Sequence, residues 1–240
     1  MKITLRIQRF NPESDDKPVY KDYTVEVEPT DRLLDALMHI KQFQDGTLGF
    51  RKSCAHGVCG SDAMRINGKG ALACKTLIQD VAESDGDIVL VEPLQHFPVQ
   101  KDLIVDQTSF FEKYRSVNPY LINDEPVTRG ERLQTHEERM RFDDTTNCIL
   151  CSACFSACPV LDENPDFLGP AAICQAYRFL ADSRDKGFEQ RLSTLDSPDG
   201  VWPCENHFEC TKACPRLIKI TKRINQTKKM IQKYRESHDE

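Results

Sequence analysis

The sequence predicts an α+β protein, in which a small sheet gripping one helix precedes a helical half. Apolar and polar residues alternate in the first hundred residues, and helical spacing with capping residues replaces that alternation beyond about Lys101. Short motifs of closely spaced cysteines occur in both halves. A chain of 240 residues can hold two small domains, and we predict them at residues 1–100 and 101–240.

The elements of the first half follow from its periodicity. Alternation over residues 3–7 and 23–27 predicts two strands, and residues 11–16 predict the hairpin turn between them. Thr30 and Asp31 are candidate caps for a helix. The apolar face of that helix is formed by Leu33, Leu34, Leu37 and Ile40.

Two further strands are predicted after the first cysteine-rich loop. Met64 and Ile66 indicate one strand, which the tight turn Asn67-Gly68 ends. Residues 88–91 indicate a buried strand that ends before Pro93. A compact sheet around one helix is the simplest arrangement of these elements.

The second half is predicted to be helical. Thr135 begins a capped helix, residues 171–182 form another, and residues 220–234 form a third. The third helix carries many basic residues, which we interpret as a solvated face, the alternative being a surface for acidic headgroups or a partner. These residues are Lys219, Lys222, Arg223, Lys228, Lys229 and Lys233.

Composition narrows the class of protein. Thirty-two Lys and Arg against 38 Asp and Glu give a net charge of -6, which argues against a nucleic-acid binder that relies on bulk positive charge. The first residues lack the apolar run of a signal peptide, and the eleven cysteines are odd in number, so we expect a reducing compartment and no disulfides. The longest uncharged stretch, residues 145–161, is too polar to span a bilayer. Membrane contact is therefore expected only at the surface or through a partner.

The most specific motif is a run of four cysteines with the spacing C-x2-C-x2-C-x3-C-P. Three thiolates two residues apart can hold three corners of a cubic four-iron cluster, whereas the fourth, followed by Pro159, reaches a second cluster. The run consists of Cys148, Cys151, Cys154 and Cys158.

A second run supplies the matching ligands. Its last cysteine, Cys214, is expected to complete the four-iron cluster, which leaves Cys158, Cys204 and Cys210 for the other cluster. His207 stands where a full run would carry another cysteine, so three thiolates favour a three-iron cluster over a four-iron one. The alternative is that His207 ligates a fourth iron.

The first half holds a two-iron motif of the spacing C-x4-C-x2-C…C, with aspartate in the third position. Its candidate ligands are Cys54, Cys59, Asp62 and Cys74. Carboxylate is a harder ligand than thiolate, so the alternative is that Asp62 is an exposed loop acid and solvent completes the site.

Other uses of these cysteines fit the spacing less well. Structural zinc prefers two well separated pairs around one ion, and four cysteines within residues 148–158 crowd that geometry. Cys174 lies outside every run and is interpreted as a small buried hydrophobe.

Five segments are similar to the iron-sulfur subunit of the succinate dehydrogenase and fumarate reductase family, and the resemblance covers nearly the whole chain. They are residues 51–62 (RKSCAHGVCGSD), 147–154 (NCILCSAC), 169–172 (GPAA), 182–185 (DSRD) and 200–204 (GVWPC). The resemblance implies an N-terminal plant-type ferredoxin (β-grasp) domain with a 2Fe-2S cluster, followed by an all-helical bacterial-type ferredoxin domain with 4Fe-4S and 3Fe-4S clusters. Some bacterial succinate dehydrogenases of the family also have aspartate in the third position.

The resemblance further implies a role as the electron relay of a succinate:quinone oxidoreductase, a respiratory complex that also serves the tricarboxylic acid cycle. Electrons enter on an FAD-containing flavoprotein subunit, cross the three clusters, and reach quinone at a hydrophobic membrane-anchor subunit. We expect a peripheral protein on the cytoplasmic side of the cell membrane. This chain has no dinucleotide fingerprint and no acid-base constellation for dicarboxylate chemistry, so no catalytic residue is assigned to it.

The quinone end departs from the family pattern. Relatives that use ubiquinone often have a tryptophan shortly after the first Cys-Pro pair, whereas here Cys158-Pro159 is followed by Val160. Lys228 matches a family lysine close to the quinone, although it can equally be a solvated lysine. Other candidates for the pocket wall are Pro159, Trp202 and His207.

Two alternatives remain at the level of function. The chain can be a free-standing ferredoxin-like carrier, or an iron-sulfur subunit that serves another flavoprotein dehydrogenase. Succinate oxidation and fumarate reduction use the same relay, so the spacing of the ligands does not indicate which of the two reactions the enzyme carries out.

Overall fold

The computed structural model describes residues 1–127 and 130–238. The chain forms two compact units, of which the first contains residues 1–107, 149–157 and 213–215, and the second contains the rest. The domain division at residue 100 stays a prediction, because compact units are sets of contacting residues and not independently folding domains.

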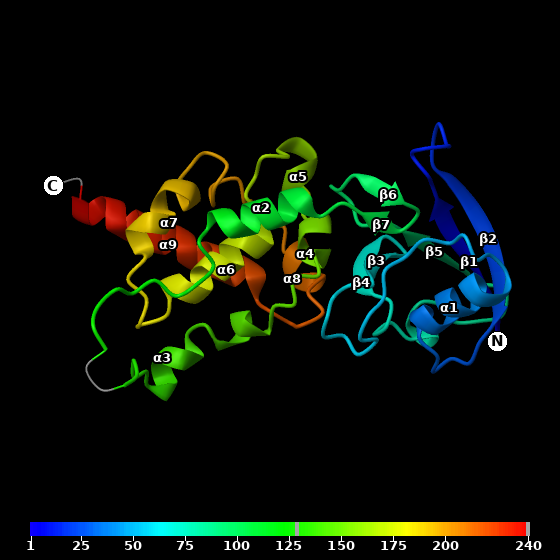
Figure 1. The fold of residues 1–240 in the computed structure, drawn as a ribbon, viewed down its shortest axis with the longest axis horizontal. Helices are drawn as coiled ribbons and strands as arrows, with labels where there is room; N and C mark the ends of the chain where they lie inside the picture. Colours follow the sequence, from blue (N-terminus) through cyan, green and yellow to red (C-terminus); the bar gives the residue numbers. More distant parts are fainter. Residues whose placement is uncertain (128–129, 239–240) are drawn as a thin grey trace. The chain divides into compact units, whose positions relative to one another are not determined.

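A five-stranded sheet forms the first unit, in the order β2-β1-β5-β3-β4 (Figure 1). β1 pairs antiparallel with β2 and parallel with β5, and β5 pairs antiparallel with β3. Ile3 and Leu5 of β1 are fully buried, as their alternation predicts. The strands are β1 (Lys2–Arg9), β2 (Val19–Glu26), β3 (Ala63–Ile66), β4 (Lys69–Leu72) and β5 (Ile88–Glu92).

The helix α1 (Leu33–Phe43) packs its apolar face into the same core as β1 and β5. Its N-cap is Arg32, so the prediction that Thr30 and Asp31 cap it is wrong. The Asp35 carboxylate accepts the backbone N–H of Arg32 at 3.2 Å, whereas Asp31 accepts the N–H of Glu28 at 2.8 Å. Asp31 therefore closes the turn before the helix instead of beginning the helix.

Several short elements of this unit were not predicted from the sequence. They include the strand β4, the hairpin of β6 (Val99–Lys101) with β7 (Ile104–Val105), and a 3-10 helix, η1 (Ile78–Asp80). Two to four residues are too few to establish a period, so the residue pattern does not reveal these elements.

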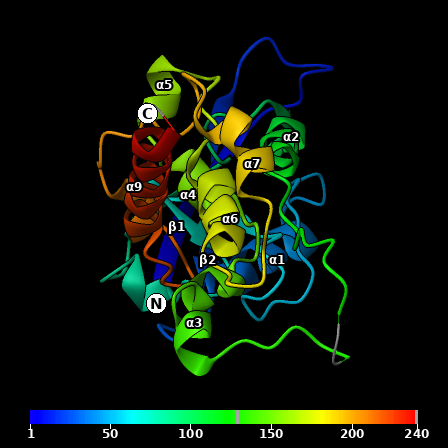
Figure 2. The same cartoon turned by 90° about the vertical axis from the view of Figure 1, so that its left-hand side faces the viewer.

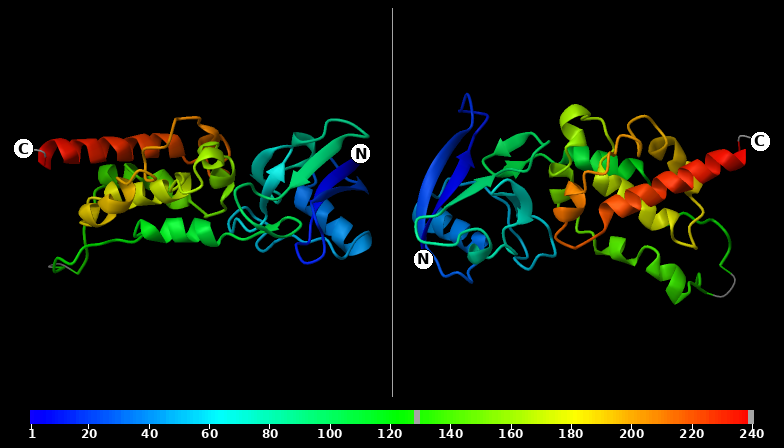
Figure 3. Two further views of the ribbon diagram at one scale, coloured as in Figure 1. Left: turned by 90° about the horizontal axis from the view of Figure 1, so that it is seen from above. Right: turned by 180° about the vertical axis from the view of Figure 1, so that it is seen from behind.

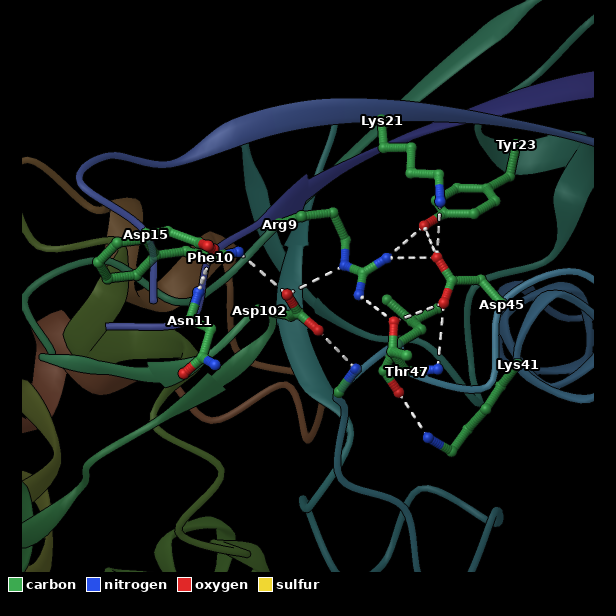
Figure 4. Close-up of polar contacts among 12 residues, drawn as sticks. Arg9, Phe10, Asn11, Asp15, Lys21, Tyr23, Lys41, Asp45, Thr47 and Asp102 are labelled. Atoms are coloured by element: carbon green, nitrogen blue, oxygen red, sulfur yellow. Dashed lines mark hydrogen bonds and ion pairs between the residues drawn. The ribbon is translucent and has the colours of Figure 1, made fainter. Parts of the chain in front are cut away.

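A polar network centred on Arg9 holds the segment just before the first cysteine loop in place (Figure 4). Arg9 donates through Nη1 to Asp45 at 2.8 Å, and its Nε lies 3.0 Å from Oδ1 of Asp102. The other oxygen of Asp102 accepts the buried backbone N–H of Gly49 at 2.7 Å. Lys41 donates to the carbonyl of Leu48 at 2.6 Å. These contacts hold residues 48 and 49, just ahead of Cys54.

Helices dominate the second unit, as predicted. α6 lies at its centre and is buried along almost its whole length, with α2, α7 and α9 packed against it (Figure 2). Figure 3 shows α9 as the long terminal helix of this unit. The helices are α2 (Thr108–Ser116), α3 (His136–Met140), η2 (Asp143–Asn147), α5 (Val160–Glu163), α6 (Pro170–Leu180), α7 (Phe188–Leu195), α8 (Glu209–Lys212) and α9 (Ile220–His238).

Thr135 caps α3 as predicted, because its hydroxyl accepts the N–H of Glu138 at 3.2 Å. Cys174 is buried within α6, as predicted. The solvated face predicted for α9 is only partly correct. Arg223 is buried and pairs with Asp144 at 2.5 Å, and Lys228 is half-buried. The four remaining basic residues, Lys219, Lys222, Lys229 and Lys233, are exposed.

Candidate cluster-binding sites

The two-iron motif occupies two segments of the first unit. Cys54 and Cys59 lie near the surface in the loop between α1 and β3, and Cys74 is buried in the segment that follows β4. The Cys54 sulfur accepts the backbone N–H groups of His56 and Cys59, both at 3.3 Å. These amides, that of His56 most strongly, lower the pKa of the Cys54 thiol to about 6. The loop thus favours the thiolate, which is the form that binds iron.

Two glycines allow this loop its conformation. Gly57 and Gly60 have φ of +71° and +70°, where a side chain is strained. A Cβ at Gly57 would lie 2.7 Å from Cδ of Lys75, and one at Gly60 would lie 2.7 Å from Cβ of Cys151. The second contact brings the loop of Cys59 against a cysteine of the four-iron motif.

Asp62 is buried, at 2% exposure, so the alternative of an exposed loop acid is wrong. Its Oδ2 accepts the backbone N–H of Cys74 at 2.6 Å, whereas Oδ1 is buried and has no hydrogen-bond partner. Burial, together with the Asp62 carboxylate, raises the pKa of the Cys74 thiol to about 11. An unsatisfied carboxylate oxygen beside a buried sulfur is costly without a cation, so these residues fit an iron cluster.

Three of the four predicted four-iron ligands belong to the first unit. Cys151 lies two residues before α4 (Ala153–Ser156) and Cys154 lies within it, whereas Cys214 comes from a distant part of the chain. All three are buried, and Cys148 directly precedes this segment. Leu150 and Ser152 have positive φ, which winds the backbone tightly between successive cysteines.

The three predicted three-iron ligands line one small cavity in the second unit. Cys158, Cys204 and Cys210 share this cavity with apolar residues, including Phe167 and Ile224. Burial raises the pKa of the Cys158 thiol to about 11, and it also raises the pKa of the Cys210 thiol. Three sulfurs converging in a mostly apolar cavity fit a cluster that holds the thiolates ionised.

The predicted quinone residues divide into two pairs. Pro159 and His207 line the cavity that contains Cys204, and His207 Nε2 lies 3.2 Å from the Glu205 carboxylate. Trp202 and Lys228 are not among the lining residues of this cavity in the described part of the chain. Lys228 donates to the carbonyl of Cys204 at 2.8 Å and to that of Trp202 at 3.3 Å, so it holds the Cys204 loop.

Hydroxyl groups beside two of the sulfurs were missed by the sequence analysis. Ser61 Oγ lies 3.1 Å from the Cys59 sulfur, and Thr221 Oγ1 lies 3.5 Å from the Cys210 sulfur. Ser61 can be found from its place inside the cysteine loop. Thr221 is eleven residues from Cys210, and no sequence signal marks it.

Within residues 1–127 and 130–238, no helix is both long and apolar enough to cross a bilayer. In the same ranges, no three His, Cys, Asp or Glu side chains are grouped as a site for a single metal ion.

Comparison with known proteins extends over both units. The family model described as a 2Fe-2S iron-sulfur cluster binding domain matches residues 4–112, and one described as a 4Fe-4S dicluster domain matches residues 140–215. The succinate dehydrogenase iron-sulfur subunit of Coxiella burnetii is 44% identical over 227 residues, which cover 93% of this chain and 94% of that one.

Another relative and a solved structure are also similar to this chain over most of its length. The fumarate reductase iron-sulfur subunit of Mycobacterium tuberculosis is 42% identical over 90% of this chain and 87% of its own length. A chain of the Mycobacterium smegmatis Sdh1 complex in the apo form superposes with a TM-score of 0.87 at 28% identity, covering 97% of this chain and 96% of that one. The predicted fold class is confirmed. The chain belongs to the family of succinate dehydrogenase and fumarate reductase iron-sulfur subunits, which transfer electrons.

Proposed function

We propose that this chain is the electron-transfer subunit of a succinate:quinone oxidoreductase, and that it relays electrons from an FAD-containing flavoprotein subunit to a membrane quinone. The observation that carries the proposal is the spacing of ten cysteines and one aspartate in three sequence motifs, in a chain of this family. Family membership supports the flavoprotein and anchor partners, since its members are subunits of such enzymes.

The 2Fe-2S cluster would be held by Cys54, Cys59, Asp62 and Cys74. The unpartnered Oδ1 of Asp62 supports carboxylate ligation, because iron is the cation that this buried oxygen otherwise lacks. The backbone amides that converge on Cys54 stabilise negative charge at this site.

The 4Fe-4S cluster would be held by Cys148, Cys151, Cys154 and Cys214, and a 3Fe-4S cluster by Cys158, Cys204 and Cys210. The cavity supports the second assignment, because three cysteines line it and no fourth does among the described residues. His207 also lines that cavity, but it is 44% exposed and lies beside Glu205. We therefore favour three irons there over ligation of a fourth by His207.

When bound, each cluster supplies a group that takes up and gives back one electron at a time. The protein keeps the ligands in place and shields most of them from water, since ten of the eleven proposed ligands are buried or half-buried and only Cys59 is exposed. The approach of Gly60 to Cys151 keeps the first two sites close. A side chain at Gly60 would push the two sites apart and so lengthen the distance that an electron crosses between them.

The quinone would bind near Pro159 and His207, at the interface with a hydrophobic membrane anchor. Two of the three protons of the Lys228 ammonium group are directed at carbonyl groups. The third is available to a quinone oxygen, with Trp202 nearby in the same loop. We accordingly propose a peripheral position on the cytoplasmic side of the cell membrane, and a place in the respiratory chain and the tricarboxylic acid cycle.

The test is a redox titration of the purified complex followed by electron paramagnetic resonance, with iron and acid-labile sulfide determined on the same sample. We expect a two-iron, a four-iron and a three-iron centre, together with a flavoprotein and a membrane anchor that copurify. Absence of the three-iron signal would overturn that assignment. A brown chain that elutes alone would instead be a free-standing carrier.

Fumarate reduction is the second candidate, because relatives at 42% and 38% identity are fumarate reductase subunits. Rates of succinate oxidation and fumarate reduction, measured on the same complex with the same quinone pool, decide between the two directions.

A further inference from the structure

A short relay of hydroxyl groups ends on the Cys210 sulfur. Thr221, in the first turn of α9, is 1% exposed and lines the cavity of the three cysteines. Its Oγ1 lies 3.5 Å from the Cys210 sulfur and 2.9 Å from Oγ1 of Thr211. The backbone N–H of Thr221 donates to the same Thr211 oxygen at 3.0 Å.

The direction of this relay follows from the chemistry of a ligating cysteine. A thiolate bound to iron has no proton and can only accept a hydrogen bond. The hydroxyl of Thr221 must then donate to Cys210, and its oxygen is left to accept from the hydroxyl of Thr211. Each bond in such a chain polarises the next, and burial strengthens them all.

We propose that Thr221 is a positioning residue that raises the reduction potential of the cluster held by Cys158, Cys204 and Cys210. This inference rests on the proposed function, in which Cys210 is a ligand. Reduction adds one electron from the preceding centre of the relay and breaks no bond. The added negative charge is shared with the sulfurs, so the hydrogen bond from Thr221 stabilises the reduced state more than the oxidised one.

A merely structural role predicts different behaviour. Thr221 also lies at the start of α9, where it could serve only to join the helix to Thr211. Valine has nearly the shape of threonine and keeps the backbone N–H, so Thr221→Val replaces the hydroxyl with a methyl group and leaves the backbone hydrogen bond to Thr211 in place. Thr221→Ser restores the hydroxyl and removes a methyl group.

The test is a redox titration of the intact complex by electron paramagnetic resonance. In Thr221→Val we expect the equilibrium constant for reduction of the three-iron centre to fall between about threefold and tenfold. That corresponds to a potential lower by about 28 to 59 mV for a one-electron couple. Thr221→Ser should titrate close to the unsubstituted complex, and Thr211→Val should shift in the same direction by less. The potentials of the other two centres, read in the same sample, should not move.

Two outcomes separate failure of this inference from failure of the proposed function. If Cys210→Ala abolishes the three-iron signal while Thr221→Val titrates like the unsubstituted complex, Cys210 is a ligand and the relay has no effect on its potential. If Cys210→Ala leaves that signal intact, the ligand assignment itself is wrong. If Thr221→Ser shifts as far as Thr221→Val, the methyl group and not the hydroxyl is responsible, and the inference is overturned.

Discussion

The carboxylate of Asp62 accepts the backbone N–H of Cys74 through one oxygen at 2.6 Å and leaves its other oxygen buried without a partner. The hydrogen bond fixes the orientation of the carboxylate beside a sulfur that is itself buried. One corner of the proposed two-iron site is therefore oriented by a hydrogen bond within the chain itself. The same arrangement makes Asp62 the most informative single residue of this site.

Substitution of Asp62 tests whether its free oxygen binds iron. We expect Asp62→Cys to retain the two-iron signal in electron paramagnetic resonance with a changed potential, because thiolate replaces carboxylate as a ligand. Asp62→Ala should lose that signal, while the signals of the other two centres persist in the same spectrum. Equal retention in both variants would remove Asp62 from the ligand set.

Lys228 is expected to serve both the quinone and the loop of Cys204. Lys228→Met removes the bonds to the Cys204 and Trp202 carbonyls, so it should alter the line shape of the three-iron signal as well as lower quinone reduction. The neighbouring Lys229 is exposed, and Lys229→Met is the matched control, with no change expected in either readout. A Lys228→Met complex with slow quinone reduction but an unchanged signal would assign Lys228 to the quinone alone.

Ser61 offers an exposed counterpart to the buried threonine relay. Its hydroxyl lies 3.1 Å from the Cys59 sulfur, in a loop where Cys59 is exposed. In Ser61→Ala, water can replace the lost donor, so we expect the equilibrium constant for reduction of the two-iron centre to change by about twofold or less. The redox titration used for Thr221 measures this too. A larger shift would mean that water does not reach the Cys59 sulfur.

The ion pair of Arg191 and Asp185 is expected to dominate the stability of the helical unit. The two side chains are 0% and 2% exposed, and the guanidinium also donates to the carbonyls of Val117, Asn118 and Tyr120. Arg191→Met leaves a buried carboxylate unpaired, which should cost about 3–5 kcal/mol.

Thermal unfolding followed by circular dichroism measures this loss. The exposed pair of Lys186 and Glu125, 3.6 Å apart, is the control, since Glu125→Gln should change stability by less than about 0.5 kcal/mol. If the two variants unfold at the same temperature, burial of the Arg191 pair does not contribute as argued.

We expect acid to lower the folding stability of the first unit by protonating the Asp45 carboxylate. Hydrogen bonds from Lys21, Thr47 and Tyr23 hold the pKa of this carboxyl far below its usual range. A lowered folded-state pKa contributes stability above the unfolded value of about 3.9, and that contribution is lost as the pH falls toward the folded pKa.

Asp45→Asn should therefore be less stable than the unsubstituted chain at neutral pH, by about 1–2 kcal/mol after allowance for solvent screening. The difference should shrink steadily below about pH 4. Urea unfolding at a series of pH values, followed by circular dichroism, provides the comparison. A difference that is constant over this range would show that the charge of Asp45 does not contribute.

The local pattern of apolar and polar residues was sufficient to predict most elements of the fold. Alternation located β1, β2 and β3, a short apolar run before Pro93 located β5, and helical spacing located α1, α6 and α9. The cap of α1 was predicted wrongly, since Thr30 and Asp31 are favoured N-cap residues and Arg32 is not, and only the fold shows that the Asp31 carboxylate is bonded to the turn before the helix. The hairpin of β6 and β7 was too short to show a period.

The sequence by itself determined the family and the candidate cysteines of each cluster, because ligand spacing along the chain is a local property. Tertiary structure decided what surrounds those cysteines. It buried Asp62, brought Gly60 against Cys151, turned Lys228 toward the Cys204 loop and placed Thr221 beside Cys210. Each of these depends on segments that meet only after folding, so no spacing in the chain could reveal them.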